Sequence, residues 1–463
     1  MLDHLESNGH DFRSLLDQVT TELAGFVDGL PQAPVDGTAT APEIVDLVAE
    51  PPGESPGDVG KVLSFAFKAG GAAIETASPR FFGYVPGSGL VSSAVGELMA
   101  RVLNRFTAIG DFAPGLVALE HGVLTWLGEL FGLPAGATGI LTSGGSAAML
   151  SMVVAARENR LGPDADPGTA RLYVSDQTHY CVAKAAHVAG FPARSVRLVP
   201  TSDGRRLDPV ALAAAIEADS AAGLRPFLVV GTAGTTNAGA VDPLGAIADV
   251  AREHGLWFHV DACYGGFFQL TTRGRARLEG IGRADSITVD PHKSLFLPYG
   301  TGALLVRERR LLTASYPGDR AAYLPDVAGD TLPDYAHLGY ELTREHRGLR
   351  IWLPLHLHGL DAFRRALDEK LDLARYLYDE LTAHPALDLP HPPELSTVVF
   401  RLREGGDEAN RALLERIQSA RRIFLSSTRL DGRLTLRLCV LSHLTHREHI
   451  DEAVTVIRAA IDA

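Results

Sequence analysis

Two short motifs carry the residue types that could perform chemistry. Lys293 lies in the segment VDPHKSLFL, directly after His292 and a few residues beyond an apolar run typical of a strand. Burial disfavours the ammonium form of a lysine, so a lysine held there loses its proton more easily, as a Schiff-base lysine requires. An ordinary surface-loop lysine fits the same residues and is the more frequent case for any single lysine. This motif alone therefore leaves the chemistry open.

The second motif is HVDACYGG, in which Asp261 ends a strongly apolar run one strand–loop–strand unit before Lys293. A buried carboxylate is costly unless it is paired. The protonated nitrogen of a pyridine ring would pair it, and this contact strengthens pyridoxal phosphate as an electron sink. A metal ligand or a helix N-cap is the alternative interpretation. If the pyridine interpretation holds, Asp261 and Lys293 face one cofactor.

Three weaker motifs also follow apolar runs. Gly145 and Ser146 belong to LTSGGSAAML, where a strand gives way to a helix whose backbone N–H groups could bind an anion. His179 could stack on a flat cofactor or transfer a proton, although it is one of 17 histidines. Thr235 and Thr236 offer hydroxyl groups in a turn. Each motif is ambiguous alone, but together they predict an anion site, an imidazole, a hydroxyl, an acid and a lysine at one sheet edge.

The elements that must position these residues form a repeating pattern. Seven apolar runs predict strands, and amphipathic segments between most of them predict helices at 147–157, 180–188, 209–218 and 244–254. Strands separated by helices indicate a mostly parallel sheet that is covered on both faces. The predicted strands are 139–142, 171–175, 195–199, 227–231, 256–260, 286–289 and 303–306.

The flanking segments have a different character. Apolar residues at helical spacing predict a helix over 11–27, whose stripe must cover this chain's body or a partner subunit. After residue 349, a helix over 353–382, strands at 397–401 and 434–440 and a final helix over 447–460 indicate an α+β unit. We therefore expect an N-terminal helical arm for dimerisation (1–85), a large cofactor-binding domain (86–350) and a small C-terminal domain (351–463).

Composition excludes several classes of protein. The 463 residues are 46% hydrophobic and 21% charged, which is ordinary for a globular enzyme subunit and argues against disorder. The net charge of -13 argues against nucleic acid as a partner. Three scattered cysteines favour neither a disulfide framework nor a metal site. No apolar run approaches the roughly 20 residues that span a bilayer, and no secretory leader pattern begins the chain, so we expect a cytoplasmic protein without a membrane partner.

HVDACYGG and DPHK together resemble the group II pyridoxal-phosphate-dependent amino-acid decarboxylases, the family of the aromatic-L-amino-acid and glutamate decarboxylases. The resemblance extends from SPRFFGYVPGSG at 78–89 to LDGRLTLRLCVLSHLT at 430–445. It implies the α/β fold of type I PLP-dependent transferases (aspartate-aminotransferase-like), with a large, mostly parallel seven-stranded sheet domain and a small α+β domain. It also implies pyridoxal 5'-phosphate (PLP) as cofactor and a homodimer with shared active sites. The implied reaction converts an L-amino acid, aromatic or an unusual biosynthetic one, to its amine and carbon dioxide.

The resemblance also implies roles for individual residues. Lys293 matches the lysine that holds the cofactor, Asp261 the partner of the pyridine nitrogen, and His179 the imidazole stacked on the ring. Tyr323 matches a loop tyrosine that delivers a proton, usually across a dimer interface. The phosphate and ring positions fall on Gly145, Ser146, His292 and Thr236.

The substrate side is assigned in the same way. Phe82, Tyr84 and Gly87 match the substrate-lining segment, and Gly87 leaves space where relatives carry a side chain. Arg344 or Arg347 could steady a substrate carboxylate.

Three positions depart from the family pattern. Asp290 replaces the usual Asn or Ala and would be an uncomfortable neighbour for a phosphate. Ser294 replaces a bulky aromatic residue, and Glu345 replaces an arginine.

Two other kinds of function remain open from the sequence. The same fold and cofactor could support decarboxylation coupled to oxidative deamination, β-elimination or aldol cleavage. Aldehyde-forming relatives typically carry phenylalanine at the loop position, so Tyr323 favours simple decarboxylation. A catalytically silent homologue with a binding role is the other alternative, and the presence of Lys293, Asp261 and His179 argues against it.

Overall fold

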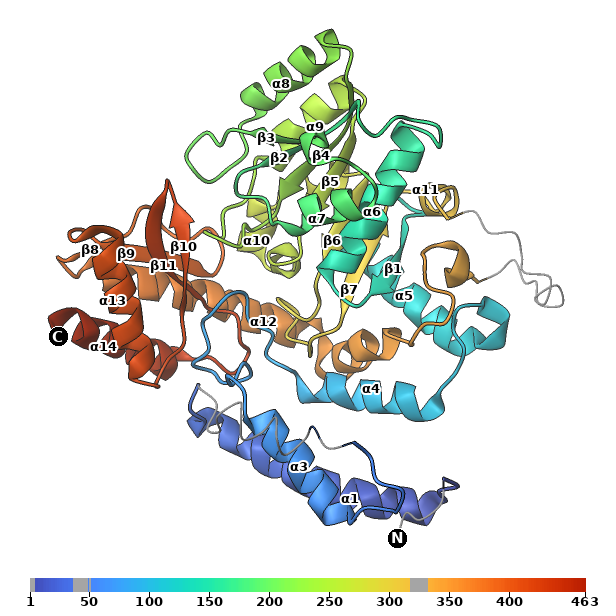
Figure 1. Ribbon diagram of the computed structural model, residues 1–463, viewed down its shortest axis with the longest axis vertical. Coiled ribbons are helices and arrows are strands. Elements are labelled where there is room, and N and C mark those ends of the chain that lie inside the picture. The colour runs from blue at the N-terminus through green and yellow to red at the C-terminus, as the bar shows by residue number, and fades with distance from the viewer. Residues whose placement is uncertain (1–4, 36–48, 50, 317–331) are drawn as a thin grey trace.

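The computed structural model describes residues 5–35, 49, 51–316 and 332–463 of the chain. Figure 1 shows a large α/β body, a smaller unit built on a second sheet, and a two-helix arm near the N-terminus. The central sheet has seven strands in the order β1-β7-β6-β5-β4-β2-β3. These strands are β1 (Thr138–Thr142), β2 (Ala170–Ser175), β3 (Val196–Val199), β4 (Arg225–Thr232), β5 (Trp257–Asp261), β6 (Ser286–Val289) and β7 (Gly302–Val306).

Six of the seven strands run in the same direction, which confirms the predicted mostly parallel sheet. Strand β7 is the exception and pairs antiparallel with both β1 and β6. It follows β6 after a loop without a helix, so it turns back instead of crossing over. The carboxyl ends of the other six strands lie at the same edge of the sheet. The segments that follow β1, β2, β4, β5 and β6 therefore meet at that edge.

The sheet is buried because helices cover it. Strands β1, β5, β6 and β7 are buried along their whole length, as their continuous apolar runs require. Helix α6 packs on five of the strands and also against α7, while α8 packs against α9. The covering helices are α6 (Gly145–Arg160), α7 (Cys181–Val188), α8 (Pro209–Ala221) and α9 (Leu244–Glu253). All four coincide with predicted helices to within a few residues.

The smaller unit is α+β, as predicted. Its antiparallel sheet has the order β10-β11-β9-β8, and the structure adds β8, β10 and α13 to the predicted elements. These elements are β8 (Leu387–Asp388), β9 (Thr397–Leu402), β10 (Ser426–Leu430), β11 (Arg433–Cys439), α13 (Gly406–Ser419) and α14 (Arg447–Asp462). The long helix α12 (Gly348–Thr382) is kinked at Gly359 and buries residues in the cores of both units. The predicted boundary at 350 lies inside α12, and the division into three domains stays a prediction.

The N-terminal arm consists of the predicted helix α1 (Gly9–Gly29) and a second helix, α3 (Val59–Gly71), which lie side by side away from the sheet (Figure 1). Neither helix buries a residue completely, and Leu23 and Phe26 are exposed. Helix α4 (Val91–Leu103) also exposes an apolar face. Helices α4 and α5 (Pro114–Leu130) both pack on α12. None of the described helices is both long enough and apolar enough to cross a bilayer.

Candidate active site

A cavity of about 300 Å³ lies at the carboxyl edge of the large sheet. Its volume is at the lower end of the range for small-molecule sites. Each of the strands β1, β2, β4, β5 and β6 contributes lining residues through the segment at or just beyond its carboxyl end. The structure thereby brings together all seven predicted cofactor residues: Gly145, Ser146, His179, Thr236, Asp261, His292 and Lys293.

The turn between β1 and α6 forms one wall of this cavity. Gly144 has a φ of 154°, and the side-chain hydroxyl of Thr142 donates to its carbonyl oxygen at 3.0 Å. A Cβ atom on Gly145 would lie only 2.6 Å from Sγ of Cys263, so the close approach requires glycine there. No side chain caps the first turn of α6. Its backbone N–H groups are therefore available to an anion in the cavity.

The acid and the imidazole come from neighbouring segments. Asp261 is buried at the end of β5, and its Oδ1 accepts a hydrogen bond from the backbone N–H of Cys263 at 3.1 Å. The Nδ1 atom of His179 accepts from the N–H of Cys181 at 3.3 Å, so the neutral ring carries its proton on Nε2. Burial lowers the pKa of His179, and Asp261 opposes that shift. The cavity thus holds a buried carboxylate beside an imidazole that favours its neutral form.

Lys293 is paired with a carboxylate. Its Nζ lies 3.0 Å from Oδ2 of Asp290, a residue that is 2% exposed. Burial alone lowers the pKa of Lys293, but Asp290, with smaller contributions from Cys263 and Asp261, raises it above the ordinary value. The expectation that this lysine loses its proton easily is therefore wrong for the chain by itself. Burial acts on this lysine as predicted, but the negative charge of Asp290 acts in the opposite direction and outweighs it.

His292 is held by the start of the next strand. Its Nδ1–H donates to the carbonyl oxygen of Thr301 at 2.7 Å, and its Nε2 lies 3.8 Å from Oδ2 of Asp290. Burial lowers the pKa of His292, while Asp290 opposes that shift. The ring is thereby fixed in orientation at the cavity wall.

The predicted substrate residues lie elsewhere, and none is among the described residues that line the cavity. Phe82 is completely buried in the core of the smaller unit, and Tyr84 is 63% exposed. Gly87 does not leave free space: a Cβ atom there would lie 2.7 Å from the carbonyl oxygen of His292 and 2.8 Å from the ring of Tyr299. That expectation is corrected, because Gly87 instead allows the chain to approach His292 closely.

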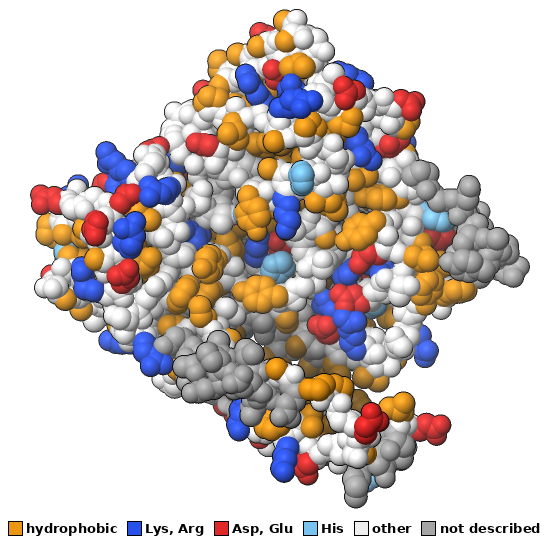
Figure 2. All heavy atoms as spheres, viewed as in Figure 1, with side chains coloured by type: hydrophobic (Ala, Val, Ile, Leu, Met, Phe, Trp, Pro, Cys, Tyr) orange, Lys and Arg blue, Asp and Glu red, His pale blue; other side chains and the backbone are white. Residues whose placement is uncertain are grey.

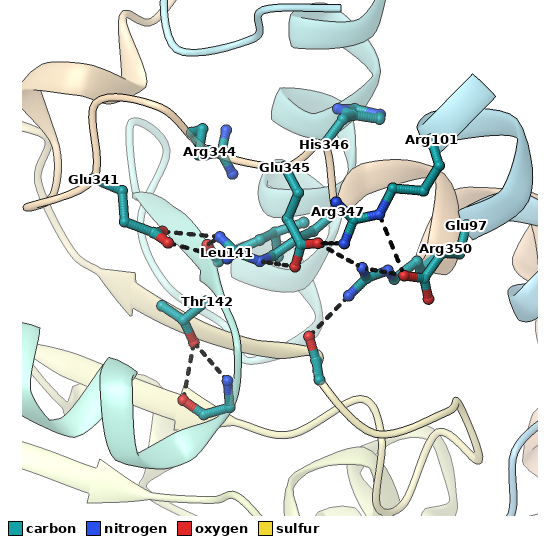
Figure 3. Close-up of polar contacts among 12 residues, drawn as sticks. Glu97, Arg101, Leu141, Thr142, Glu341, Arg344, Glu345, His346, Arg347 and Arg350 are labelled. Carbon is teal, nitrogen blue, oxygen red and sulfur yellow. Dashed lines mark hydrogen bonds and ion pairs between the residues drawn. The ribbon is translucent and has the colours of Figure 1, made fainter. Parts of the chain in front are cut away.

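The two predicted carboxylate-binding arginines are paired within this chain. Arg344 forms a buried ion pair with Glu120, and its guanidinium lies 4.5 Å from the centre of the Tyr335 ring. Arg347 bonds to Glu341 at 2.9 Å and to Glu345 at 3.1 Å, as Figure 3 shows. Both positive charges are therefore balanced by side chains of the chain itself, which leaves no observation in favour of either arginine as a substrate ligand.

A buried arginine outside the cavity lining was not considered from the sequence. Arg437 on β11 is 3% exposed, and its Nη1 donates to the carbonyl oxygen of Tyr84 at 2.7 Å and to Oγ of Ser426 at 3.0 Å. Its Nε and Nη2 are buried without a hydrogen-bond partner, and no acid among the described residues forms an ion pair with it. Cys439, two residues along the same strand face, lies close to Tyr264, which lines the cavity. An arginine inside the apolar run LTLRLCV was the available signal.

Tyr323, the predicted proton donor, lies outside the described residues.

Comparisons with known proteins agree with this arrangement. A family model described as the pyridoxal-dependent decarboxylase conserved domain matches residues 71–403. The aromatic-L-amino-acid decarboxylase of Bacillus atrophaeus is 31% identical over 471 residues, covering 99% of this chain and 97% of that protein. The structure of Oryza sativa TDC with PLP and tryptamine is similar with a TM-score of 0.94 at 30% identity, covering 99% of each chain. Rhodiola rosea 4-hydroxyphenylacetaldehyde synthase is similar with a TM-score of 0.91 at 25% identity, covering 98% of each chain.

The family match covers well over half of the chain, and the curated relative aligns along nearly its whole length. The structural neighbour with a TM-score of 0.94 was solved with PLP. The chain therefore belongs to the pyridoxal-dependent decarboxylase family and is a PLP-dependent carboxy-lyase.

Proposed function

We propose that this enzyme decarboxylates an aromatic L-amino acid to its amine. The observation that supports an aromatic substrate is a pair of exposed tyrosines beside the cavity. The ring centroid of Tyr180 lies 4.5 Å from that of His179, and the centroid of Tyr299 lies 5.6 Å from that of His292. Both histidines line the cavity, so an aromatic side chain could pack against rings that flank it. Figure 2 shows one face of the molecule, with a histidine near its centre and hydrophobic side chains around it.

The residues fit PLP in type and position. Lys293 would hold the cofactor covalently, Asp261 would pair with its pyridine nitrogen, and His179 would lie over its ring. When bound, PLP accepts the electron pair that is freed as carbon dioxide leaves. The start of α6, where no side chain caps the backbone N–H groups, supports binding of the phosphate group there. The remaining contacts to the phosphate and ring are assigned to Gly145, Ser146, His292 and Thr236.

We propose Arg437 as the ligand of the substrate carboxylate. It is not among the described residues that line the cavity, but Cys439, two residues further along β11, lies close to Tyr264 of that lining. This guanidinium is buried, has two unpartnered nitrogen atoms and lacks an acid partner among the described residues. Removing one partner of a buried charge pair costs about 2–5 kcal/mol, which corresponds to roughly a thirtyfold or greater effect. Arg437→Met is therefore expected to raise KM by at least about thirtyfold while PLP still binds. An unchanged KM would contradict this assignment.

The product is tested separately from the substrate. An amino-acid panel assayed for amine, aldehyde, ammonia and carbon dioxide should give amine and carbon dioxide in equal amounts with an aromatic substrate. Tyr323→Phe should shift the product toward aldehyde and ammonia. Stoichiometric aldehyde formation and oxygen consumption by the unaltered enzyme would instead favour the oxidative alternative. An aldehyde is the product named for the Rhodiola rosea relative.

We also propose a cytoplasmic homodimer with shared active sites. The exposed apolar side chains of α1 and α4 support a second copy as the partner, since contiguous apolar surface is unusual on a monomer. The three cysteines are buried and unpaired, which suits a reducing compartment. Light scattering should give twice the 49.4 kDa chain mass. A monomer at assay concentration that is fully active would contradict the shared site.

A further inference from the structure

The carboxylate of Asp290 occupies an unusual position in the cavity. Its Oδ2 lies 3.0 Å from Nζ of Lys293, while its Oδ1 is buried without a hydrogen-bond partner. A Cβ atom on Gly145 would lie 3.0 Å from Oδ2, and one on Gly302 would lie 2.9 Å from Oδ1. The carboxylate is thus enclosed between the β1–α6 turn and the start of β7, where it has little freedom to turn away from the lysine.

Among the charged and titratable groups around Asp290, Lys293 is the positively charged partner. His292 is 3.8 Å away, but burial lowers its pKa and so favours the neutral ring. Cys263, Asp261 and the more distant His179 and Cys181 face the same cavity, and none of them is a permanent cation. The ion pair between Asp290 and Lys293 is therefore the main charge interaction of both residues.

We propose that Asp290 is a positioning residue that keeps Nζ of Lys293 protonated and fixed before the cofactor is attached, and so limits the rate of covalent attachment. The proposal rests on the assignment of Lys293 as the attachment site under Proposed function. What the proposal adds is that a neighbouring acid slows attachment at Lys293. That acid is the first residue of DPHK, a position where the family often has Asn or Ala.

The attachment chemistry explains why a rate is affected. The lone pair of neutral Nζ attacks the aldehyde carbon of PLP and forms a C–N bond. The carbonyl oxygen then leaves as water, and a C=N bond that retains one proton on nitrogen replaces the C=O bond. Ammonium plus aldehyde therefore gives protonated Schiff base plus water, with no net change in protons. Asp290 changes how often Nζ is neutral and able to attack, not the balance of the reaction.

The test is the rate of cofactor attachment to the apoprotein. PLP is mixed with cofactor-depleted full-length protein between pH 6 and 9.5, and the visible absorbance of the Schiff base is followed at several PLP concentrations. The concentration dependence separates initial binding, read from half-saturation, from attachment, read from the limiting rate. Borohydride reduction and peptide mapping identify the modified lysine.

Three variants make the test specific. Asp290→Asn keeps the side-chain shape and removes the charge. Asp290→Glu restores a carboxylate and should restore slow attachment. Asp285→Asn is the matched control, because Asp285 precedes β6 whereas Asp290 follows it, so the control removes a carboxylate at the opposite end of the same strand. Circular dichroism checks that each variant is folded.

An opposite charge within about 4–6 Å shifts the pKa of a lysine by roughly one unit or more. Asp290→Asn should therefore raise the limiting rate of attachment at neutral pH about tenfold or more. It should also move the rate–pH profile to lower pH by a unit or more. Asp285→Asn should have the limiting rate and the profile of the unaltered protein. If Asp290→Asn leaves both the limiting rate and the profile unchanged while Lys293 carries the label, the inference is overturned and the site assignment stands. A label on another lysine overturns the site assignment itself.

Discussion

Glu120→Gln removes the negative charge from a completely buried ion pair. The side chain of Glu120 is 0% exposed, that of Arg344 is 3% exposed, and Nδ1 of His346 lies 3.4 Å from the second carboxylate oxygen. The substitution keeps the shape but leaves the guanidinium of Arg344 buried beside the Tyr335 ring without a counter-charge. Breaking a buried pair from one side typically costs about 3–5 kcal/mol, because the remaining charge is desolvated and uncompensated.

The assay for Glu120→Gln is the free energy of unfolding in urea, followed by tryptophan fluorescence. The expected loss is about 3–5 kcal/mol, and the double variant Glu120→Gln/Arg344→Gln should recover part of it. Asp361→Asn, which removes an exposed acid paired with Arg364 and Arg365, is the control and should change little. A loss for Glu120→Gln no larger than that of the control would refute the reasoning.

The same pair predicts an acid limit to stability. Burial alone would raise the pKa of Glu120, but the charge of Arg344, the hydrogen bond from Arg344 and the nearby ring of His346 lower it below the usual value. A carboxyl group whose pKa is lowered on folding stabilises the fold above its unfolded pKa. This contribution disappears as the pH falls through the lower, folded value. Stability of the unaltered enzyme should therefore fall below about pH 4.5, and Glu120→Gln should fall less steeply there.

Two further predictions concern glycines at the cavity. Gly145→Ala should weaken PLP binding by at least about fivefold in a fluorescence titration. The new Cβ would lie 2.6 Å from Sγ of Cys263, and overpacking of this kind costs about 1–3 kcal/mol. Gly122→Ala, where nothing lies within 4 Å, is the control and should bind normally. Gly87→Ala should raise KM or lower PLP affinity by displacing the ring of Tyr299, and wild-type values for both would contradict the close approach seen here.

The sheet and most of the cavity could be predicted because the signal is local. Each apolar run ends where a polar residue begins, and parallel strands bring such ends together, so Asp261, His179 and Lys293 meet without further information. The antiparallel direction of β7 is less visible in the sequence. It depends on the loop after Lys293 containing no helix, while the run ALLV looks the same in either direction.

The partners of charged side chains could not be predicted, since they depend on contacts between distant segments. Arg344 pairs with Glu120 on α5, more than two hundred residues earlier in the chain. No local pattern links the two residues, so Arg344 stayed among the predicted substrate ligands. Arg437 shows the reverse case. In the sequence it is one more residue of a C-terminal strand, whereas in the structure two of its nitrogen atoms are buried without a hydrogen-bond partner. The pairing of Asp290 with Lys293 was within reach, because the two residues are three positions apart.

The most direct test of the central claim is the site of cofactor attachment. Purified enzyme loaded with PLP should be yellow, and borohydride reduction followed by peptide mapping should place the pyridoxyl label on Lys293 alone. Asp261→Asn should weaken PLP binding, and Lys293→Ala should abolish the label without unfolding the protein. A label on a different lysine, or none at all on folded and PLP-saturated enzyme, would contradict the account.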